Sequence, residues 1–456
     1  MDEIRLLIDF GSTYTKVVVV DLYQEEIIAQ AYVPSTVETD ITIGLNDALE
    51  IIKRKTNIIN PDKIKSYACS SAAGGLRMVC IGFVPAYTSK AANYAALGAG
   101  AKIVDYFSYK LNNSEIKRIE FLAPDIILLC GGTDGGDYRV ILHNARELAE
   151  TNNGVKNIIV AGNKTTHDEI KNIFRGSGKH LFFTENVMPE LKQLNLEPCK
   201  KIVRELFIHN IIEVKGIAKA KEIIQDVIMP TPAAVLEAAK LISTGYKNST
   251  GFGELVLIDI GGATTDVYSI GKGLPSHDSV IMEGLPEPFQ KRTVEGDLGL
   301  KHNLDTLAGL AGYEKLGPDF KKAVRLFWAG ALPNTKNQWD CYTTLTKTAL
   351  GIAVNRHVGR LNIRYGPEGD YYVQQGKDLT AIDCIIGTGG PLIFHSNPRQ
   401  IMEGAVYKPE TPSILKPKKP KFFLDGLYIL FAVGLLSQSN PAEAYNIAKK
   451  YIFQIS

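Results

Sequence analysis

Short apolar runs separated by small polar turns recur along the chain, a pattern that predicts β-strands. One such run, at residues 6–8, leads to Asp9 and a Gly-Ser-Thr turn. Lys16 then opens a second run of four valines at residues 17–20. β-Branched residues on both sides of a short polar turn are typical of a β-hairpin. We therefore predict a hairpin over residues 6–20.

A second hairpin with a similar sequence is predicted far along the chain. The apolar run at residues 254–258 leads to Asp259 and a glycine-rich turn, after which extended structure resumes at 266–268. Laying residues 8–17 over residues 258–267 gives five identities in ten positions. The identical residues are Ile8, Asp9, Gly11, Thr15 and Val17. An internal match at such a turn indicates a duplicated domain.

Between the two hairpins, apolar strands alternate with stretches of helical pattern. The predicted strands are 125–130, 157–160 and 181–184, and the predicted helices are 138–150 and 166–174. The first of these strands ends at the glycine-rich loop Gly131–Gly136. Strands alternating with helices of this length predict right-handed βαβ units and a small parallel sheet. We interpret residues 119–225 as a separate α/β module inserted into the first half.

The remaining segments complete the predicted organisation. A helix is expected over residues 233–243, because the prolines just before it suit a first helical turn. A Lys/Pro run at 408–421 predicts an exposed connector, and residues 422–453 predict helices. The two copies of the duplicated domain are called lobe I and lobe II. The predicted parts are lobe I (1–118), the module (119–225), a connecting helix (226–250), lobe II (251–420) and C-terminal helices returning to lobe I (421–456).

Composition agrees with a soluble globular protein. The chain has 456 residues, of which 45% are hydrophobic and 22% charged, and its length predicts two to four domains. A net charge of only +2 gives no overall attraction to nucleic acid or to an acidic membrane surface. The six cysteines form no CxxC pair, and no signal peptide is evident. The longest apolar run, residues 422–436, is too short to span a bilayer and is interpreted as a buried helix. We expect a cytoplasmic protein.

The two hairpins carry candidate chemistry. Glycine allows the backbone of a turn to approach an anion, and turn N–H groups can bind phosphate oxygens. Asp9 and Asp259 would hold Mg²⁺ through water molecules, because magnesium dehydrates reluctantly. Lys16 is placed to reach the terminal phosphates, and Asp266 is a further acidic candidate. The alternative is a pair of ordinary β-turns in which the aspartate caps each hairpin, and the match between the two hairpins argues against it.

A third glycine-rich string follows another apolar strand. Residues 384–386 lead to Gly387, Thr388, Gly389 and Gly390. Such a turn allows close approach of a flat ligand such as adenine with its ribose. Glycine turns after strands are common, so the string adds weight only together with the two hairpins.

Taken together, these strings resemble the actin-like ATPase superfamily, which includes sugar kinases and the seventy-kilodalton heat-shock chaperones. Residues 8–13 are similar to its first phosphate motif, residues 259–266 to its second and residues 387–390 to its adenosine motif. Lys16 falls where actin carries a phosphate-contacting lysine. Residues 230–234 and 427–436 are similar to its two connecting helices. The order and spacing fit nearly the whole chain apart from the inserted module.

The resemblance implies an α/β fold with duplicated actin-like (ribonuclease H-like) ATPase domains and the inserted module. It implies catalytic roles for Asp9, Lys16 and Asp259, with Mg²⁺ held between the two aspartates. It implies ATP binding by Gly11, Ser12, Thr13, Gly261, Gly262, Ala263, Thr264, Asp266, Gly387, Thr388, Gly389 and Gly390. Met229 stands where the chaperones have a glutamate, so no general base is evident, and hydrolysis is either slow or uses another side chain.

Three further strings resemble the family called MutL in glutamate mutase operons, which is unrelated to the mismatch-repair protein of that name. They are Ser70–Met78, Gly131–Gly136 and Thr293–Gly299. The resemblance implies a chaperone-like reactivating ATPase whose partner is an adenosylcobalamin-dependent mutase subunit, with cobalamin met only through that partner. Each string also has a structural interpretation: a strand-edge turn, a packed loop, and a solvated loop for Arg292, Glu295 and Asp297.

Two other functions stay open at this point. A small-molecule kinase of the same superfamily needs a catalytic carboxylate beside a substrate pocket, and none is evident. A non-catalytic module would use the inserted unit to hold a cobalamin or a nucleotide. The Asp-x-His-x-x-Gly string of cobalamin modules that displace the lower axial base does not occur in the chain, which disfavours direct cobalamin ligation.

Overall fold

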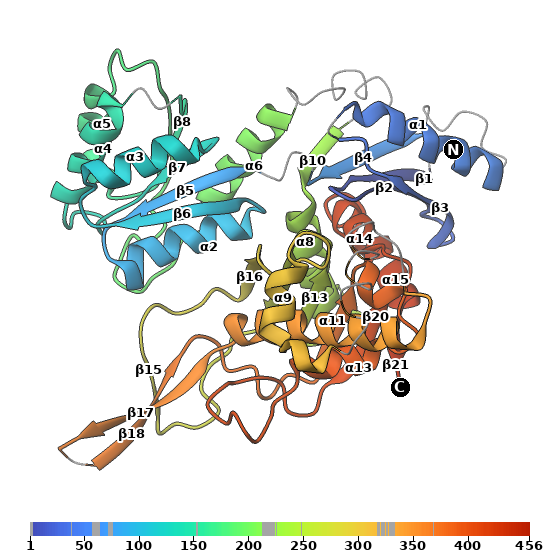
Figure 1. The fold of residues 1–456 in the computed structure, drawn as a ribbon. Helices are drawn as coiled ribbons and strands as arrows, with labels where there is room; N and C mark the ends of the chain where they lie inside the picture. Colours follow the sequence, from blue (N-terminus) through green and yellow to red (C-terminus); the bar gives the residue numbers. More distant parts are fainter. Residues whose placement is uncertain are drawn as a thin grey trace. The chain divides into compact units, whose positions relative to one another are not determined.

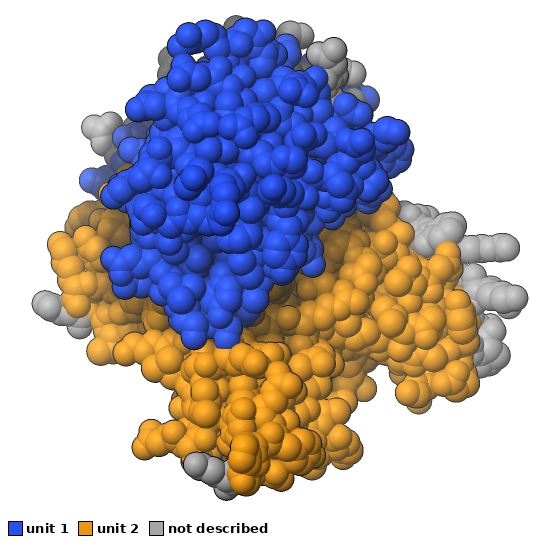
Figure 2. Space-filling view, turned by 90° about the vertical axis from the view of Figure 1, so that its left-hand side faces the viewer, with its two compact units in different colours: residues 1–20, 28–233, 284–288 blue, residues 21–27, 234–283, 289–456 orange. Residues whose placement is uncertain are grey.

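A computed structural model describes most of the chain (Figure 1). The described residues are 3–37, 39–56, 64–71, 76–151, 154–211, 224, 226–247, 249–316, 320, 324, 327, 333–367 and 369–456. They divide into two compact units, each of which is described by itself. Unit 1 comprises residues 1–20, 28–233 and 284–288, and unit 2 comprises residues 21–27, 234–283 and 289–456, shown in blue and orange in Figure 2.

The first sheet has five strands in the order β10-β4-β1-β2-β3. Their bounds are β1 Ile4–Phe10, β2 Tyr14–Asp21, β3 Glu26–Pro34, β4 Lys65–Ser70 and β10 Asp226–Pro230. β1 and β2 form the predicted hairpin, whereas β4 pairs with β1 and with β10 in parallel. Helix α1 (Ile41–Lys55) follows this hairpin and β3, and Asp40 caps its N-terminus by accepting a hydrogen bond from the Thr42 backbone.

The second sheet repeats this arrangement in unit 2. Its order is β16-β14-β13-β19-β20-β21, with bounds β13 Leu255–Ile260, β14 Thr265–Ile270, β16 Gln290–Glu295, β19 Cys384–Thr388, β20 Lys421–Asp425 and β21 Ile452–Ile455. When the strands of each sheet are numbered by their order along the chain, both sheets contain the same spatial order, third-second-first-fourth-fifth. In the second sheet β13, β14 and β16 are antiparallel neighbours, and β19 pairs in parallel with β13 and β20. The duplication predicted from the two hairpins is confirmed.

A third sheet, all parallel, has the order β6-β5-β7-β8-β9. The strands are β5 Arg77–Gly82, β6 Lys102–Ser108, β7 Ile126–Leu129, β8 Asn157–Val160 and β9 His180–Phe183. The strand order is that of a doubly wound α/β sheet. The sheet begins at Arg77 rather than near residue 119. Strands β5 and β6 lack the glycine-rich loop that follows β7, so the sequence analysis did not assign them to the module.

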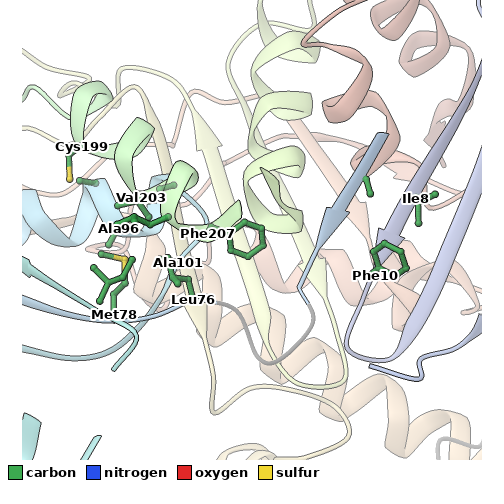
Figure 3. Close-up of a cluster of buried hydrophobic side chains, with 14 of the residues drawn as sticks. Ile8, Phe10, Leu76, Met78, Ala96, Ala101, Cys199, Val203 and Phe207 are labelled. Carbon is green, nitrogen blue, oxygen red and sulfur yellow. The ribbon is translucent and has the colours of Figure 1, made fainter. Parts of the chain in front are cut away.

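Helices cover both faces of this module sheet. Apolar side chains of α2 (Lys90–Gly98) and α6 (Glu197–Ile211) share one buried cluster with Met78, Cys80 and Leu128 (Figure 3). Side chains of α3 (Asn113–Leu122), α4 (Arg139–Glu150) and α5 (His167–Ile173) share another with Val79 and Leu129. The strand residues alternate between the clusters because successive side chains point to opposite faces. The short helices η3 (Pro85–Ser89) and η4 (Lys164–Thr166) complete the module.

The C-terminal part differs from the predicted helices. Residues 422–436 are not one buried helix: strand β20 is followed by helix α14 (Leu430–Leu436). α15 (Pro441–Tyr451) and β21 follow, and residues 421–456 belong to unit 2, where β20 and β21 extend the second sheet. The Lys/Pro run is only partly an exposed connector, because Lys416 is buried and its ammonium donates to the carbonyl oxygen of Gly404 at 2.8 Å.

Unit 2 also contains helices and small sheets around these strands. The helices are α9 Leu304–Ala311, η5 Tyr313–Lys315, α11 Lys336–His357, α12 Gly390–Ile393, α13 Pro398–Met402 and η6 Glu403–Ala405. The small sheets are formed by β15 Val280–Met282, β17 Arg360–Gly366 and β18 Gly369–Gln375, and by β11 Gly245–Tyr246 with β12 Ser249–Thr250. No helix in the described part of the chain is both long and apolar enough to cross a membrane.

The predicted first connecting helix is α8 (Thr231–Thr244), which begins in unit 1 and continues in unit 2. The predicted second one contains α14. The two helices meet where Gly434 faces the backbone of Ala234: a Cβ on Gly434 would lie 1.8 Å from the Ala234 carbonyl oxygen. Only glycine permits so close an approach of two helix backbones.

Candidate functional site

The first predicted phosphate turn is a tight hairpin turn in unit 1. The Gly11 backbone N–H donates to the Tyr14 carbonyl oxygen at 3.0 Å. Ser12 and Thr13 are exposed, whereas Gly11 is buried. A Cβ on Gly11 would lie 2.6 Å from the Tyr14 oxygen, so the turn closes because this residue is glycine.

The Asp9 carboxylate at the end of β1 is only 1% exposed and lies among three partners. Its Oδ2 is 2.7 Å from the Lys16 ammonium on β2. Its Oδ1 accepts a hydrogen bond from the Thr231 hydroxyl at 2.6 Å and lies 3.6 Å from the Cys69 sulfur. Burial and the neighbouring Asp9 charge raise the pKa of the Cys69 thiol, which keeps it protonated. Both Asp9 oxygens are therefore held by residues of unit 1.

Thr231 is a site residue that the sequence analysis missed. It is the first residue of α8, and the strand before it, β10, pairs with β4 so that Pro230 aligns with Ser70. This register brings the start of the helix to the end of β1. The prolines on either side of Thr231 were the available signal, since they mark a helix start, but its contact with Asp9 spans 222 positions along the chain.

Replacing Thr231 with valine is expected to destabilise the protein by about 1–3 kcal/mol. Valine keeps the shape but removes the hydroxyl that satisfies a buried carboxylate oxygen, and an unmet buried acceptor costs this much. The matched control is Thr380→Val, which removes a hydroxyl 2.6 Å from a partly exposed Asp378, where water replaces the donor. Urea denaturation followed by circular dichroism compares the two. Equal midpoints for both variants would contradict the role given to Thr231.

The second predicted phosphate turn lies in unit 2 and is closed in the same way. The Gly261 backbone N–H donates to the Thr264 carbonyl oxygen at 2.9 Å, as Gly11 does in the first turn. Asp259 at the end of β13 is directly opposite Asp266 on β14. The duplicated sequence therefore folds into the same turn twice.

The charges around the two turns differ. Asp266 occupies the position that corresponds to Lys16, so a carboxylate replaces an ammonium. Arg292 on β16 neutralises it: the guanidinium nitrogens lie 2.7 and 2.9 Å from Asp266 Oδ1. The Thr264 hydroxyl donates to Oδ2 at 2.8 Å. Asp266 and Arg292 are 7% and 5% exposed, so this is a buried ion pair. Asp259 is more exposed than Asp266 or Asp9.

The segment after β16 forms backbone hydrogen bonds with the second turn and supports it. The backbone N–H groups of Leu300 and Lys301 donate to the carbonyl oxygens of Gly261 and Gly262 at 3.1 and 2.8 Å. A Cβ on Gly299 would lie 2.3 Å from Ala263, so this contact requires glycine. The Thr293–Gly299 string thus has a structural role. Apart from the glycine itself, no local pattern indicates this role.

Glu295 and Asp297 do not belong to a simply solvated loop, because both carboxylates pair with an arginine. The Arg356 guanidinium on α11 lies 2.6 Å from Glu295 and 2.8 Å from Asp297. This arginine lowers the pKa of Asp297, whereas burial raises the pKa of Glu295 against the effect of Arg356. These ion pairs attach the segment after β16 to α11, and this segment in turn supports the second turn.

The predicted adenosine string lies beside the second turn. β19 is the parallel neighbour of β13, and Thr388 aligns with Asp259. Gly389 has a positive φ of 97°, and a Cβ there would lie 2.2 Å from the Ile260 oxygen and 2.9 Å from Asp259 Oδ1. The structure therefore brings Asp259 and Gly387–Gly390 together at one edge of the second sheet. This edge lies at the carboxyl ends of β13 and β19, where open α/β sheets bind ligands.

Asp425 is a second residue that the sequence analysis missed at this edge. It is fully buried, and its Oδ2 accepts from the Thr388 hydroxyl at 3.0 Å. It also accepts from the backbone N–H groups of Ile429 and Leu430 at 2.9 and 3.2 Å. One carboxylate thus joins the adenosine string to the first turn of α14. The apolar run around Asp425 hid it, because the run was interpreted as a helix.

The glycine-rich loop of the module is closed by its own residues. The buried Asn163 amide accepts from the Gly135 backbone at 3.0 Å and donates to the Gly136 oxygen at 3.1 Å. The buried Asn186 amide donates to Gly132 and to Asp134, each at 3.0 Å. These bonds favour the packed-loop interpretation of Gly131–Gly136.

Only the ends of the Ser70–Met78 string can be described. The Ser71 backbone N–H donates to the Phe10 oxygen at 3.0 Å, beside Asp9. The Arg77 guanidinium donates to the carbonyl oxygens of Leu122 and Ala123 at 2.5 and 3.1 Å, which is a structural contact. Residues 72–75 lie outside the described residues. Met229, in place of the chaperone glutamate, is buried on β10.

The first turn belongs to unit 1, whereas the second turn and the adenosine string belong to unit 2. The bridging of one triphosphate by both turns stays a prediction. Among the described residues, no three histidine, cysteine or acidic side chains form a group suited to hold a metal directly.

The two sheets of matching order, each with a glycine turn after its first strand, place the protein in the class of duplicated actin-like (ribonuclease H-like) folds. A family model described as "MutL protein" matches residues 5–452. The chain belongs to this MutL family, the one associated with glutamate mutase and not the mismatch-repair protein of the same name. "Protein MutL" of Clostridium tetanomorphum is 43% identical over 460 residues, 99% of each chain.

Solved structures found to be similar include a glycerol dehydratase reactivase and a gluconate kinase from Lactobacillus acidophilus. The reactivase is 11% identical, with 96% of this chain and 100% of that chain covered and a TM-score of 0.37. The kinase is 10% identical, with 99% and 93% covered and a TM-score of 0.36. Similarities this distant assign neither protein's activity to the chain.

Proposed function

We propose that this protein is an ATP-binding, chaperone-like reactivating factor for an adenosylcobalamin-dependent mutase. The observation that carries the proposal is the repeated turn: Asp9 and Asp259 each end a buried strand, and each is followed by a glycine turn closed by the same hydrogen bond. Membership of the MutL family supports the mutase as partner. ATP, Mg²⁺ and the mutase are parts of the proposal.

The proposed nucleotide site assigns separate roles to the two turns. In unit 2, Gly387–Gly390 would receive the adenosine, and the turn Gly261–Thr264 would bind phosphate through its backbone. Asp259 would hold Mg²⁺ through water, because the Asp266 oxygens already accept from Arg292 and Thr264. Carboxylate oxygen and water are the ligands that magnesium prefers, so this donor set fits the ion. Bound magnesium would neutralise phosphate charge.

In unit 1, the turn Gly11–Thr13 would bind the terminal phosphates together with Lys16. The Lys16 ammonium now lies 2.7 Å from Asp9, and a phosphate would compete with the carboxylate for it. Asp9 Oδ2 would then be available to hold Mg²⁺ through water, while the Thr231 hydroxyl keeps Oδ1 of the same carboxylate in place. Lys16 thus acts as a phosphate sensor in the proposal, because a bound phosphate and the Asp9 carboxylate would compete for its ammonium.

Nucleotide binding would change the relation between the two units, because contacts to the terminal phosphate exist in only one nucleotide state. A decisive shift of such an equilibrium needs about 5.5 kcal/mol of differential binding. Several backbone contacts and a metal held by two aspartates are of this order. The mutase would respond to the change by releasing damaged cobalamin so that intact cofactor enters.

The test is reactivation of an inactivated mutase. Glutamate, methyleneglutarate, ornithine and lysine mutases are each inactivated with hydroxocobalamin and then given this protein, adenosylcobalamin and ATP·Mg²⁺. We expect one of them to regain activity, and no recovery when ATP is omitted. The partner is identified independently by pull-down from native cells with and without ATP. Failure to recover or retrieve any mutase would contradict the proposal, and a phosphorylated small molecule would favour a kinase instead.

A further inference from the structure

A five-residue strap, Gly284–Pro288, passes from one unit to the other and back. The strap itself belongs to unit 1, whereas the residues on both sides of it, Glu283 and Phe289, belong to unit 2. It joins β15 to β16, both of which are strands of unit 2. Its sequence, Gly-Leu-Pro-Glu-Pro, is the proline-rich segment that interrupts the second half of the chain.

The strap is anchored in unit 1 by a buried carboxylate and a buried apolar side chain. The Glu287 side chain is 6% exposed, accepts a hydrogen bond from the Tyr94 hydroxyl at 2.8 Å and lies 3.4 Å from the Lys90 ammonium. Burial and the Glu287 charge raise the pKa of Tyr94, so the phenol stays protonated as the donor. Leu285 is 2% exposed within the main apolar cluster of unit 1. Lys90 and Tyr94 are both on α2 of the inserted module.

Both ends of the strap are fixed in unit 2. The Glu283 backbone N–H donates to the Gln374 oxygen at 2.9 Å, and its carboxylate lies 3.1 Å from Arg364. At the other end, the Phe289 oxygen accepts from the Gly271 backbone at 3.0 Å and from the Lys377 ammonium at 2.8 Å. Because both ends of the strap are held, a displacement of Glu287 is transmitted to the residues of unit 2 at these ends.

The strap leads into β16, which pairs with β14 beside the second phosphate turn. Phe289 is followed by β16, on which Arg292 pairs with Asp266 across from Asp259. Only four residues separate Glu287 from Arg292. Pro286 and Pro288 fix their own φ angles, which stiffens the path.

We propose that this strap couples the nucleotide turn of unit 2 to helix α2 of the inserted module. The proposal rests on the proposed function, since it needs ATP·Mg²⁺ to bind at the Asp259 turn. A shift of Arg292 on nucleotide binding passes along β16 to Glu287 and Leu285, and from there to α2. Coupling free energies are reciprocal. If nucleotide binding changes the affinity of α2 for a partner enzyme by a given factor, binding of that partner changes the nucleotide affinity by the same factor.

The test slackens the strap without removing its anchors. Two glycines are inserted after Pro288, between the Glu287 anchor and β16, and in a control protein they are inserted after Gly176, an open loop position of the module with no atom near an added Cβ. Lengthening a connection by two residues adds only a small loop-closure entropy cost, because that cost grows slowly with length. Hydrogen exchange of the α2 peptide is measured with and without ATP·Mg²⁺, and nucleotide affinity is measured by calorimetry.

In the unaltered protein and the Gly176 control, ATP·Mg²⁺ is expected to change the exchange rate of α2 at least about threefold. In the slack-strap protein, binding persists and this response is lost. Tyr94→Phe, which removes one anchor bond, is expected to reduce the response, whereas Glu169→Gln, which removes an exposed ion pair of the module, is not.

Two results would overturn the inference in different ways. In the first, all proteins bind ATP·Mg²⁺, and the exchange rate of α2 changes equally in all of them or does not change in the unaltered protein. That result refutes coupling through the strap and leaves the proposed function standing. Absence of ATP·Mg²⁺ binding by the unaltered protein refutes the proposed function and the strap together.

Discussion

Replacing Asp259 with asparagine is expected to weaken ATP·Mg²⁺ binding about 100-fold, a loss of about 2.8 kcal/mol. Asparagine keeps the size of the side chain at the end of β13 but removes the charge that would hold the metal. Contacts to a charged group contribute about 1.5–3 kcal/mol, which sets the magnitude. Asp266 does not replace it, since Arg292 and Thr264 occupy its two oxygens.

The binding of metal-free ATP gives the sharper measurement. Loss of a negative charge near the phosphates removes repulsion, so Asp259→Asn is expected to bind metal-free ATP as tightly as the unaltered protein or more tightly. The advantage that magnesium gives should therefore disappear in this variant. Calorimetric titrations with ATP in Mg²⁺ and in EDTA compare the two conditions.

The control for this experiment is Asp378→Asn in the same unit. Asp378 accepts hydrogen bonds from Ser276 and Thr380 at a partly exposed turn, so it tests the general effect of losing one carboxylate. It is expected to leave both affinities unchanged. Equal magnesium dependence in Asp259→Asn and the unaltered protein would refute the metal role of Asp259.

The sequence predicted the parts of the fold that local patterns determine. The two hairpins were evident because each combines an apolar strand, an aspartate and a glycine turn within about ten residues, and the structure closes both with the same hydrogen bond. Strands β7, β8 and β9 and helices α4 and α5 of the module followed from their alternation, whereas α6 was not predicted. Such features depend on neighbours in the chain, which a sequence displays directly.

The missed features depend on contacts between distant positions. Thr231 touches Asp9, Asp425 touches Thr388, and Arg292 neutralises Asp266. In each case the residue type is unremarkable in its local context, and its role comes from strand register. Residues 422–436 were misjudged for another reason: a short apolar run has no period that separates a strand from a helix. Strand β20 and helix α14 share that run, and the turn between them contains a single glycine.

The crossing of α8 and α14 leads to the second large effect. Gly434→Ala is expected to destabilise the protein by about 3 kcal/mol. The new Cβ would lie 1.8 Å from the Ala234 carbonyl oxygen and 2.5 Å from its carbonyl carbon, so one helix must move by more than an ångström. Overpacking of a buried contact costs about 1–3 kcal/mol and occasionally more. Both neighbours of the contact are backbone atoms, which cannot rotate away.

Two opposing effects determine whether Gly434→Ala stabilises or destabilises the protein: the helix propensity of alanine and the clash with the Ala234 backbone. A substitution at a second glycine, which has no such clash, measures the first effect alone. Alanine in a helix interior is favoured over glycine by about 1 kcal/mol. Gly351→Ala in α11 retains that gain, because its nearest neighbour, the Gly404 oxygen, would be 3.4 Å away. We therefore expect Gly351→Ala to be neutral or stabilising by up to about 1 kcal/mol, whereas Gly434→Ala lowers the urea midpoint. If Gly434→Ala were also neutral or stabilising, helix propensity would outweigh the contact, and the close packing of α14 on α8 would be refuted.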